Sequence, residues 1–245
     1  VNSRDDLYIE FVTLHNTIGC YEKSLQLLEA RQFHPWEGGE GKTLGQYVQA
    51  HVELAKQALD DSRFTDAEHL LRKALDNPVN LGEAKLAGAQ ENNIFYYLGC
   101  ALEAQGKAEA AKQAFEVASQ GLEEPASAMY YNDQPPEMIF YQGLAWRKLG
   151  NENQAKSRFN KLIDYGDDHL FKELKIDYFA VSLPDFLVFD ESLSRKNEVH
   201  CRFMIALGCM GHGKTEQALE QFKLVLELEP AHQGAITHSM MIGFI

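Results

Sequence analysis

The residues with the most specific chemical pattern are Gly208–Thr215, which read GCMGHGKT. This stretch fits G-x-x-x-x-G-K-[ST], the pattern of a phosphate-binding loop. In such a loop the lysine faces the phosphates of a nucleotide, and the surrounding backbone N–H groups form a concave nest. The pattern predicts nucleotide hydrolysis only if a strand precedes it, a helix follows it and a parallel sheet surrounds it.

A second stretch that could bind a ligand is FHPWEGGEGK, residues Phe33–Lys42. One interpretation is a connector whose Trp36 fills a groove between neighbouring helix pairs, because a large aromatic side chain gains most from burial. The other makes Trp36 a stacking platform for a ligand such as a sugar, with polar contacts from His34, Glu37 and Glu40. The sequence leaves both interpretations open. A helix is expected to begin just afterwards, with Thr43 as its N-cap.

The overall composition narrows the classes of partner. The 245 residues carry 23 Lys and Arg against 36 Asp and Glu, a formal net charge of -13. Such an acidic chain is unsuited to nucleic acid or to an anionic membrane surface, so neither partner is predicted. No apolar run approaches the roughly 20 residues that span a bilayer, and we expect a cytoplasmic protein. Because the chain begins with Val1 rather than Met, we expect it to be cut from a longer protein.

Residue types that serve catalysis or metal binding do not cluster along the sequence. The four cysteines form no C-x-x-C pair and no zinc-like spacing with histidine; they are Cys20, Cys100, Cys201 and Cys209. Reduced thiols are the expectation in a cytosolic chain. No nucleophile, base and acid can be matched by spacing, so the sequence predicts no catalytic residue, no metal and no cofactor.

The elements that have to position these residues form an internal repeat. Four stretches align, each with an apolar helical stripe, a turn and a second stripe: 51–74, 95–118, 139–162 and 202–225. Early in the second stripe a small residue is followed, one helical turn later, by a large apolar one: Ala67 and Leu71, Ala111 and Phe115, Ala155 and Phe159, Ala218 and Phe222. A fainter copy contains Gly19, Ser24 and Leu28. The small residue lets two antiparallel helices approach closely, and the large one fills the gap toward the next pair.

This repeat resembles the tetratricopeptide repeat, whose pattern has Leu-Gly in the first helix, Gly at the turn, and Ala, Phe and Ala in the second helix. The clearest matches are Leu98, Gly99, Gly106, Ala111, Phe115 and Ala118. The resemblance implies an all-α fold, a right-handed α-solenoid of about five helix pairs in a single domain over residues 1–245. The copies are spaced more widely than the family's period of about 34 residues. Long connectors are therefore expected, with an extended inserted segment near 177–195.

The register of the repeat gives Gly208–Thr215 a role other than nucleotide binding. Gly213 and Lys214 occupy the turn between two helices, the position held by Gly106 and Gly150 in earlier copies. The apolar residues before them, which could pass for a strand, then form the first helix. Only about 30 residues follow the motif, which leaves no room for a further βαβ unit. A nucleotide hydrolase acting through Gly208–Thr215 is therefore the least favoured function.

Fixed positions of each first helix line the concave groove of a tetratricopeptide array. The resemblance makes these positions candidate partner contacts: Asn93, Tyr96, Glu103, Phe140, Arg147, His200 and Phe203. Family members that grip a peptide's terminal carboxylate use Lys, Asn and Arg there, whereas the set here is mainly aromatic, acidic and apolar. It favours an apolar or aromatic ligand surface, or packing against a connector.

The larger arrangement places FHPWEGGEGK before one helix and YFAVSLPDFLVFDE before the last copy. It resembles the C-terminal tetratricopeptide-like region of large bacterial proteins that carry a β-sandwich domain of uncharacterised function. We therefore expect a scaffold that binds a protein, a peptide or a neighbouring domain of the same polypeptide. The alternative is an accessory domain of a carbohydrate-active or sugar-binding protein. The sequence does not predict an oligomeric state.

Overall fold

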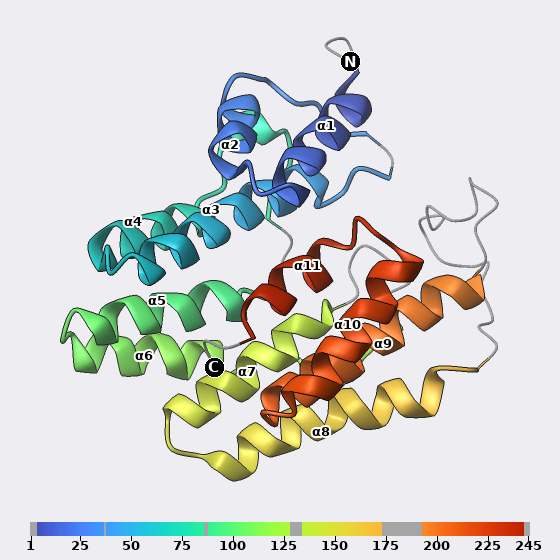
Figure 1. The fold of residues 1–245 in the computed structure, drawn as a ribbon. Helices are drawn as coiled ribbons and strands as arrows, with labels where there is room; N and C mark the ends of the chain where they lie inside the picture. The colour runs from blue at the N-terminus through green and yellow to red at the C-terminus, as the bar shows by residue number, and fades with distance from the viewer. Residues whose placement is uncertain (1–3, 37, 86–87, 128–133, 173–192, 243–245) are drawn as a thin grey trace. The chain divides into compact units, whose positions relative to one another are not determined.

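The computed structural model describes residues 4–36, 38–85, 88–127, 134–172 and 193–242, and every regular element in these ranges is helical (Figure 1). The chain divides into two compact units, Val1–Ala118 and Ser119–Ile245. The single domain expected over 1–245 stays a prediction. Of the extended segment expected near 177–195, residues 177–192 lie outside the described ranges, and the remainder opens a helix.

Unit 1 contains three helix pairs, and each helix packs on its neighbours in the chain. The pairs are α1 (Asp5–Thr17) with α2 (Tyr21–Glu29), α3 (Lys42–Asp60) with α4 (Phe64–Ala74), and α5 (Asn92–Ala104) with α6 (Ala108–Ala118). A short 3-10 helix, η1 (Val79–Leu81), interrupts the connector between α4 and α5.

The described residues of unit 2 form two helix pairs and a further helix. The pairs are α7 (Pro136–Lys148) with α8 (Glu152–His169), and α9 (Leu193–Gly211) with α10 (Thr215–Leu228); α11 (Gln233–Met240) follows. In Figure 1, α8, α9 and α10 run alongside one another, in keeping with the close packing of α9 against both. The all-α class and the five antiparallel pairs predicted from the sequence are confirmed.

The five turns within the pairs share one backbone geometry. A residue with positive φ ends each first helix: Gly19, Ser62, Gly106, Gly150 and Gly213. In each turn this residue donates its N–H to a carbonyl three residues earlier, and the next residue donates to a carbonyl five residues earlier. This is the Schellman motif, which satisfies the last carbonyl groups of a helix and favours glycine because the left-handed conformation has no Cβ clash there. Ser62 adopts the same conformation, with φ of 60°.

In the α5–α6 and α7–α8 pairs, a phenylalanine of the second helix packs on a glycine of the first. A Cβ added to Gly99 would lie 2.5 Å from the Phe115 ring, and one added to Gly143 would lie 2.3 Å from the Phe159 ring. Both rings are buried, as are Phe222 and Leu71 at the same position of their pairs. The small residues that the sequence pairs with these large ones are buried as well, so both sets are core residues, as predicted: Ala67, Ala111, Ala155 and Ala218.

Phe159 is the most heavily shared of these rings. A Cβ on Gly211 of α9 would lie 2.2 Å from it, so glycines of α7 and α9 both pack on this one ring. The Arg147 guanidinium lies 5.2 Å from the ring centroid, within the range of a cation–π interaction. Phe159 therefore joins α7, α8 and α9 into one core.

This packing makes a stability prediction. Gly143→Ala and Gly211→Ala should each lower the free energy of unfolding by about 1 to 3 kcal/mol, because the added methyl overpacks the site against the Phe159 ring. Thermal or urea unfolding measures the change.

Gly45 provides the matched control. It also lies inside a helix, but a Cβ there meets nothing within 4 Å. Gly45→Ala should stabilise the chain by about 0.5 to 1 kcal/mol, because alanine loses less backbone entropy on folding. Equal effects at the three glycines would contradict the Phe159 packing.

Candidate functional site

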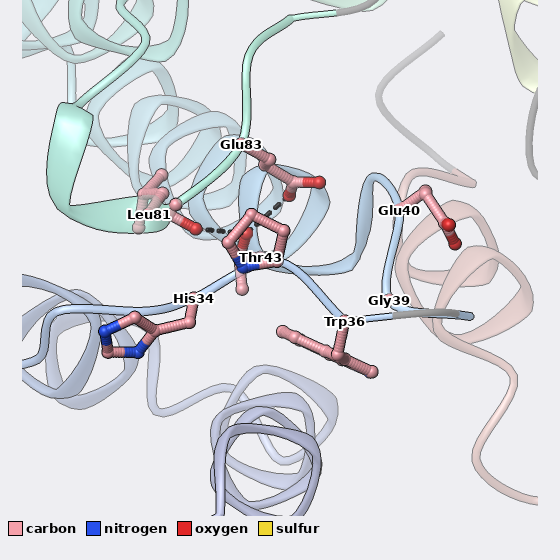
Figure 2. A pocket seen from close by; sticks show the side chains of 9 residues that line it. His34, Trp36, Gly39, Glu40, Thr43, Leu81 and Glu83 are labelled. Carbon is pink, nitrogen blue, oxygen red and sulfur yellow. Dashed lines mark hydrogen bonds between the residues drawn. The ribbon is translucent and has the colours of Figure 1, made fainter.

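The connector between α2 and α3 forms one wall of a recess of about 300 Å³ (Figure 2). Its lining residues are His34, Pro35, Trp36, Gly39, Glu40, Thr43, Leu81, Gly82 and Glu83. Three of the four connector residues predicted from the sequence thus surround one recess, which we call the connector pocket: His34, Trp36 and Glu40. The fourth, Glu37, lies outside the described residues.

Trp36 is half-buried where it lines this pocket. Its ring packs against the hydrophobic core of unit 1, which includes Phe33 and Leu81. Gly39 lies directly on the ring, since a Cβ there would be 2.1 Å from Trp36 Cε2. The ring therefore fills a gap in the core and lines the pocket as well, so the two roles that the sequence left open are geometrically compatible.

Glu83 fixes the back of the pocket. Its carboxylate accepts hydrogen bonds from the N–H groups of Gly41 at 2.6 Å and Leu44 at 2.8 Å, and from the Thr43 hydroxyl. The unsatisfied N–H groups and the dipole at a helix N-terminus favour an anion there. Glu83 is thus the cap of α3, and the N-cap residue is Gly41 rather than the predicted Thr43. No local sequence signal marks Glu83, because it caps a helix about 40 residues earlier in the chain.

A salt-bridged cluster anchors the His34 end of the pocket. Asp5 accepts from the His34 N–H at 2.9 Å and from Arg31 Nε at 2.6 Å. Burial alone would raise the pKa of Asp5, but these hydrogen bonds and the Arg31 charge outweigh it and lower that pKa. The His34 side chain itself is exposed.

The first-helix candidates of unit 1 lie on α5. Asn93 Oδ1 accepts a hydrogen bond from the Ile94 N–H at 2.9 Å, at the start of the helix. The Tyr96 ring is half-buried, with its centroid 6.1 Å from that of Phe115. Glu103 is exposed near the C-terminal end. Tyr96 and Glu103 are therefore accessible in part, as partner contacts have to be.

The first-helix candidates of unit 2 lie deeper. Phe140 and Phe203 are 0% and 3% exposed, and their rings lie 6.0 Å and 6.1 Å from Phe159 and Phe222. Arg147 pairs with Glu152 and donates to the Gly211 carbonyl at 2.8 Å. His200 Nε2 donates to the Ala126 carbonyl at 2.8 Å. These four side chains therefore make contacts within unit 2, and the two phenylalanines are core residues in this structure.

Helix α11 covers three aromatic side chains of unit 2 that we call the aromatic face: Phe140, Tyr141 and Phe203. The His238 ring lies 5.7 to 5.8 Å from all three rings. Its Nδ1 donates to the Gly234 carbonyl at 2.7 Å, and its Nε2 accepts from the Tyr141 hydroxyl at 3.2 Å. No local sequence pattern indicates this cover, because Tyr141 and His238 are 97 residues apart.

The stretch Gly208–Thr215 contains the end of α9, the turn around Gly213 and Lys214, and the first residue of α10, as the repeat register predicts. Gly208 and Gly211 belong to α9. The N–H groups of His212, Gly213 and Lys214 bond to carbonyls of the same helix at 2.9 to 3.1 Å. They are therefore not directed at a phosphate, and Lys214 is the exposed residue before α10.

Side chains suited to metal binding or nucleophilic chemistry are dispersed. Within the described ranges, no three His, Cys, Asp or Glu side chains come together to hold a metal ion. Burial raises the pKa of the Cys201 thiol to about 11, so this group is protonated at neutral pH.

No helix in the described ranges has the length and apolar character needed to cross a bilayer.

Comparison with protein families identifies the repeats. The model described as the tetratricopeptide repeat matches residues 94–119 and 137–165. The first match covers the α5–α6 pair and the second covers the α7–α8 pair up to residue 165. These two helix pairs are thus similar to tetratricopeptide repeats.

Solved structures of two tetratricopeptide-type proteins resemble the chain weakly. One is YrrB, titled a TPR protein with an unusual peptide-binding site; the match covers 95% of this chain and 90% of that chain, with 15% identity and a TM-score of 0.31. The other is MamA, with 88% and 92% covered, 17% identity and a TM-score of 0.29.

The turn geometry at Lys214 predicts that this residue is dispensable. Lys214→Ala should change the free energy of unfolding by less than about 0.5 kcal/mol, as at an ordinary surface position. Calorimetric titration with ATP and Mg²⁺ should give no heat of binding. Binding in the micromolar range that disappears in Lys214→Ala would contradict the turn assignment.

The docking of α11 should depend on pH through His232. The Ala235 N–H donates to His232 Nδ1 at 3.0 Å, and burial against Phe203 lowers the pKa of His232 from 6.5 to about 4. Above pH 6.5 the ring is neutral whether α11 is docked or released. As the pH falls from 6.5 toward 4, the released form takes up a proton that the docked form does not, so docking weakens. At pH 5.5 hydrogen exchange in α11, corrected for intrinsic rates, should be about tenfold faster than at pH 7.5.

His232→Asn is the control for this pH dependence. Asparagine can also cap a helix, but it does not titrate. The variant should keep α11 docked and flatten the dependence between pH 7.5 and 5.5. An unchanged pH profile in this variant would assign the effect to another group.

Proposed function

We propose that this chain is a scaffold that binds a protein or peptide segment, and that a basic side chain of that segment enters the connector pocket. Tetratricopeptide repeats typically bind proteins or peptides, which supports the general role. The observation that carries the finer proposal is the pocket lining, which combines the Trp36 indole with the carboxylates of Glu40 and Glu83 and includes no Lys or Arg.

The charge of the pocket supports this choice of side chain. Glu40 makes no hydrogen bond or ion pair with any described residue, and in Figure 2 its carboxylate lies to one side of Trp36, clear of the Thr43–Glu83 pair. A guanidinium or ammonium group over an indole gains about 0.5 to 2 kcal/mol. The net charge of -13 attracts a basic segment over a longer range.

A second candidate is a neutral sugar stacked on Trp36. His34, Trp36 and Glu40 line the same pocket, so polar groups flank an aromatic platform. This arrangement would suit an accessory domain of a sugar-binding protein. The two candidates differ in electrostatics, because a neutral ligand is nearly insensitive to salt whereas a basic one is screened.

Isothermal titration against basic and charge-neutral peptides selected from an array, and against simple sugars, tests the proposal. For a basic peptide, Trp36→Ala should weaken binding about tenfold, the loss of roughly 1.4 kcal/mol. Glu40→Gln should weaken it less, and the effect should shrink as salt is raised. Circular dichroism of each variant checks that the helices persist.

Glu216→Gln serves as the matched control, since Glu216 is an exposed residue of α10 in unit 2. It removes the same charge from the chain and should leave affinity unchanged. A sugar that binds independently of salt, with loss in Trp36→Ala, would favour the second candidate. Peptide affinity that is unchanged in both Trp36→Ala and Glu40→Gln would refute the role of the pocket.

A further inference from the structure

The two carboxylates that line the connector pocket differ in how many of their acceptor positions are in use. A carboxylate offers about four such positions, two on each oxygen. Glu83 Oε1 accepts from the Leu44 N–H at 2.8 Å and from the Thr43 hydroxyl, and Glu83 Oε2 accepts from the Gly41 N–H at 2.6 Å. One position on Glu83 Oε2 therefore remains free. Glu40 bonds to none of the described residues, so both of its oxygens are free.

Both carboxylates also lack a cationic partner. The donors to Glu83 are two backbone N–H groups and a hydroxyl, all of them neutral. Neither Glu83 nor Glu40 forms a salt bridge with any residue that the structure describes, and both residues are half-buried. A carboxylate withdrawn from water is stabilised by a cation that also donates hydrogen bonds to it. The pocket therefore suits a cation with several N–H donors.

The free oxygens of Glu40 suit a guanidinium better than an ammonium. Two parallel N–H groups of a guanidinium bond to both oxygens of one carboxylate, whereas an ammonium acts as a point charge. In Figure 2 the Glu40 carboxylate stands clear of the Thr43–Glu83 pair, which leaves it open to such a fork. A guanidinium is also more weakly hydrated than an ammonium, so it enters a recess at lower cost.

Trp36 adds a planar surface beside these carboxylates. Its indole is held in one orientation, because it packs against the core of unit 1 and a Cβ on Gly39 would lie 2.1 Å from its Cε2. A guanidinium stacks on an aromatic ring, and a ring that is already fixed loses little freedom when a ligand binds. The pocket volume of about 300 Å³ lies at the low end for ligand pockets, so it accommodates a single side chain.

We propose that the connector pocket selects arginine over lysine, and that Glu40 is the residue that determines this specificity. The two Glu40 oxygens accept the guanidinium fork, Trp36 stacks on its plane, and Glu83 adds negative charge. This inference rests on the proposed function, which leaves the kind of basic side chain open. The partner is then a segment that presents an arginine. Methylation of that arginine keeps its charge but blocks the paired hydrogen bonds, and so weakens the complex.

Capped pentapeptides of the form Gly-Ser-X-Ser-Gly are the probes, in which X is arginine, lysine, symmetric dimethylarginine or citrulline. Each is titrated into the full chain while NMR follows the indole N–H signal of Trp36, which the Trp36→Phe variant identifies. The arginine form should bind at least about tenfold more tightly than the lysine form. Dimethylarginine should lose most of this advantage, and citrulline, which is neutral, should bind most weakly.

Glu40→Gln tests the source of the preference. An amide has one acceptor oxygen and no charge, so the arginine form should lose more affinity than the lysine form. The preference for arginine should then fall to about threefold or less. Partial unfolding would lower both affinities alike and leave their ratio unchanged. Glu216→Gln, the control in unit 2, should keep the full preference.

The outcomes separate this inference from the proposed function. Equal or tighter binding of the lysine form, with loss of binding in Trp36→Ala, would overturn the selectivity and leave the proposed function intact. A preference for arginine that persists in Glu40→Gln would overturn the role of Glu40. Binding of neither the arginine nor the lysine form would overturn the inference and count against the proposed function as well.

Discussion

The close packing of a large apolar side chain of each second helix is the interaction on which the rest of the structure depends, and in the α5–α6 and α7–α8 pairs it joins a phenylalanine to a glycine of the first helix. In these two pairs the glycine lies on the first helix, before the turn, and the phenylalanine lies on the second helix, after the turn. One turn geometry therefore sets the positions of both residues. In unit 2 the Phe159 ring packs on Gly143 and Gly211 together and so joins successive pairs. A methyl group at either glycine would push two helices apart, because protein cores are packed too densely to absorb it elsewhere.

The long connectors give unit 1 its distinctive surface. A connector with no helix of its own must satisfy its backbone groups in another way. Here residues 30–41 and the stretch around η1 bond to each other: the Phe33 N–H donates to the Asn80 carbonyl, and the Asn80 side chain donates to carbonyls of Leu28 and Arg31. The Glu83 carboxylate then closes the start of α3. The pocket beside Trp36 results from this mutual bonding of two loops.

Unit 2 uses the equivalent aromatic positions differently. Tyr96 in unit 1 remains partly accessible, whereas Phe140 and Phe203 are closed off by the rings of the second helices and by His238 of α11. A position that lines a groove in a regular array thus becomes core once a further segment of the same chain lies on it. The hydrogen bond between Tyr141 and His238 gives that cover a defined orientation, because a buried polar group that is left unpaired is costly.

The sequence by itself determined the five helix pairs, their turns and the small-to-large pairing, because each depends on residues within about one helix pair of each other. The same local register identified Gly208–Thr215 as a turn despite its resemblance to a phosphate-binding loop. It also placed His34, Trp36 and Glu40 in one connector, although not in one pocket. Only the tertiary structure decided that Glu83 caps α3 and that α11 covers Phe140 and Phe203. These contacts join residues from about 40 to nearly 100 positions apart, and which distant segments meet is set by how whole helices pack rather than by any local spacing.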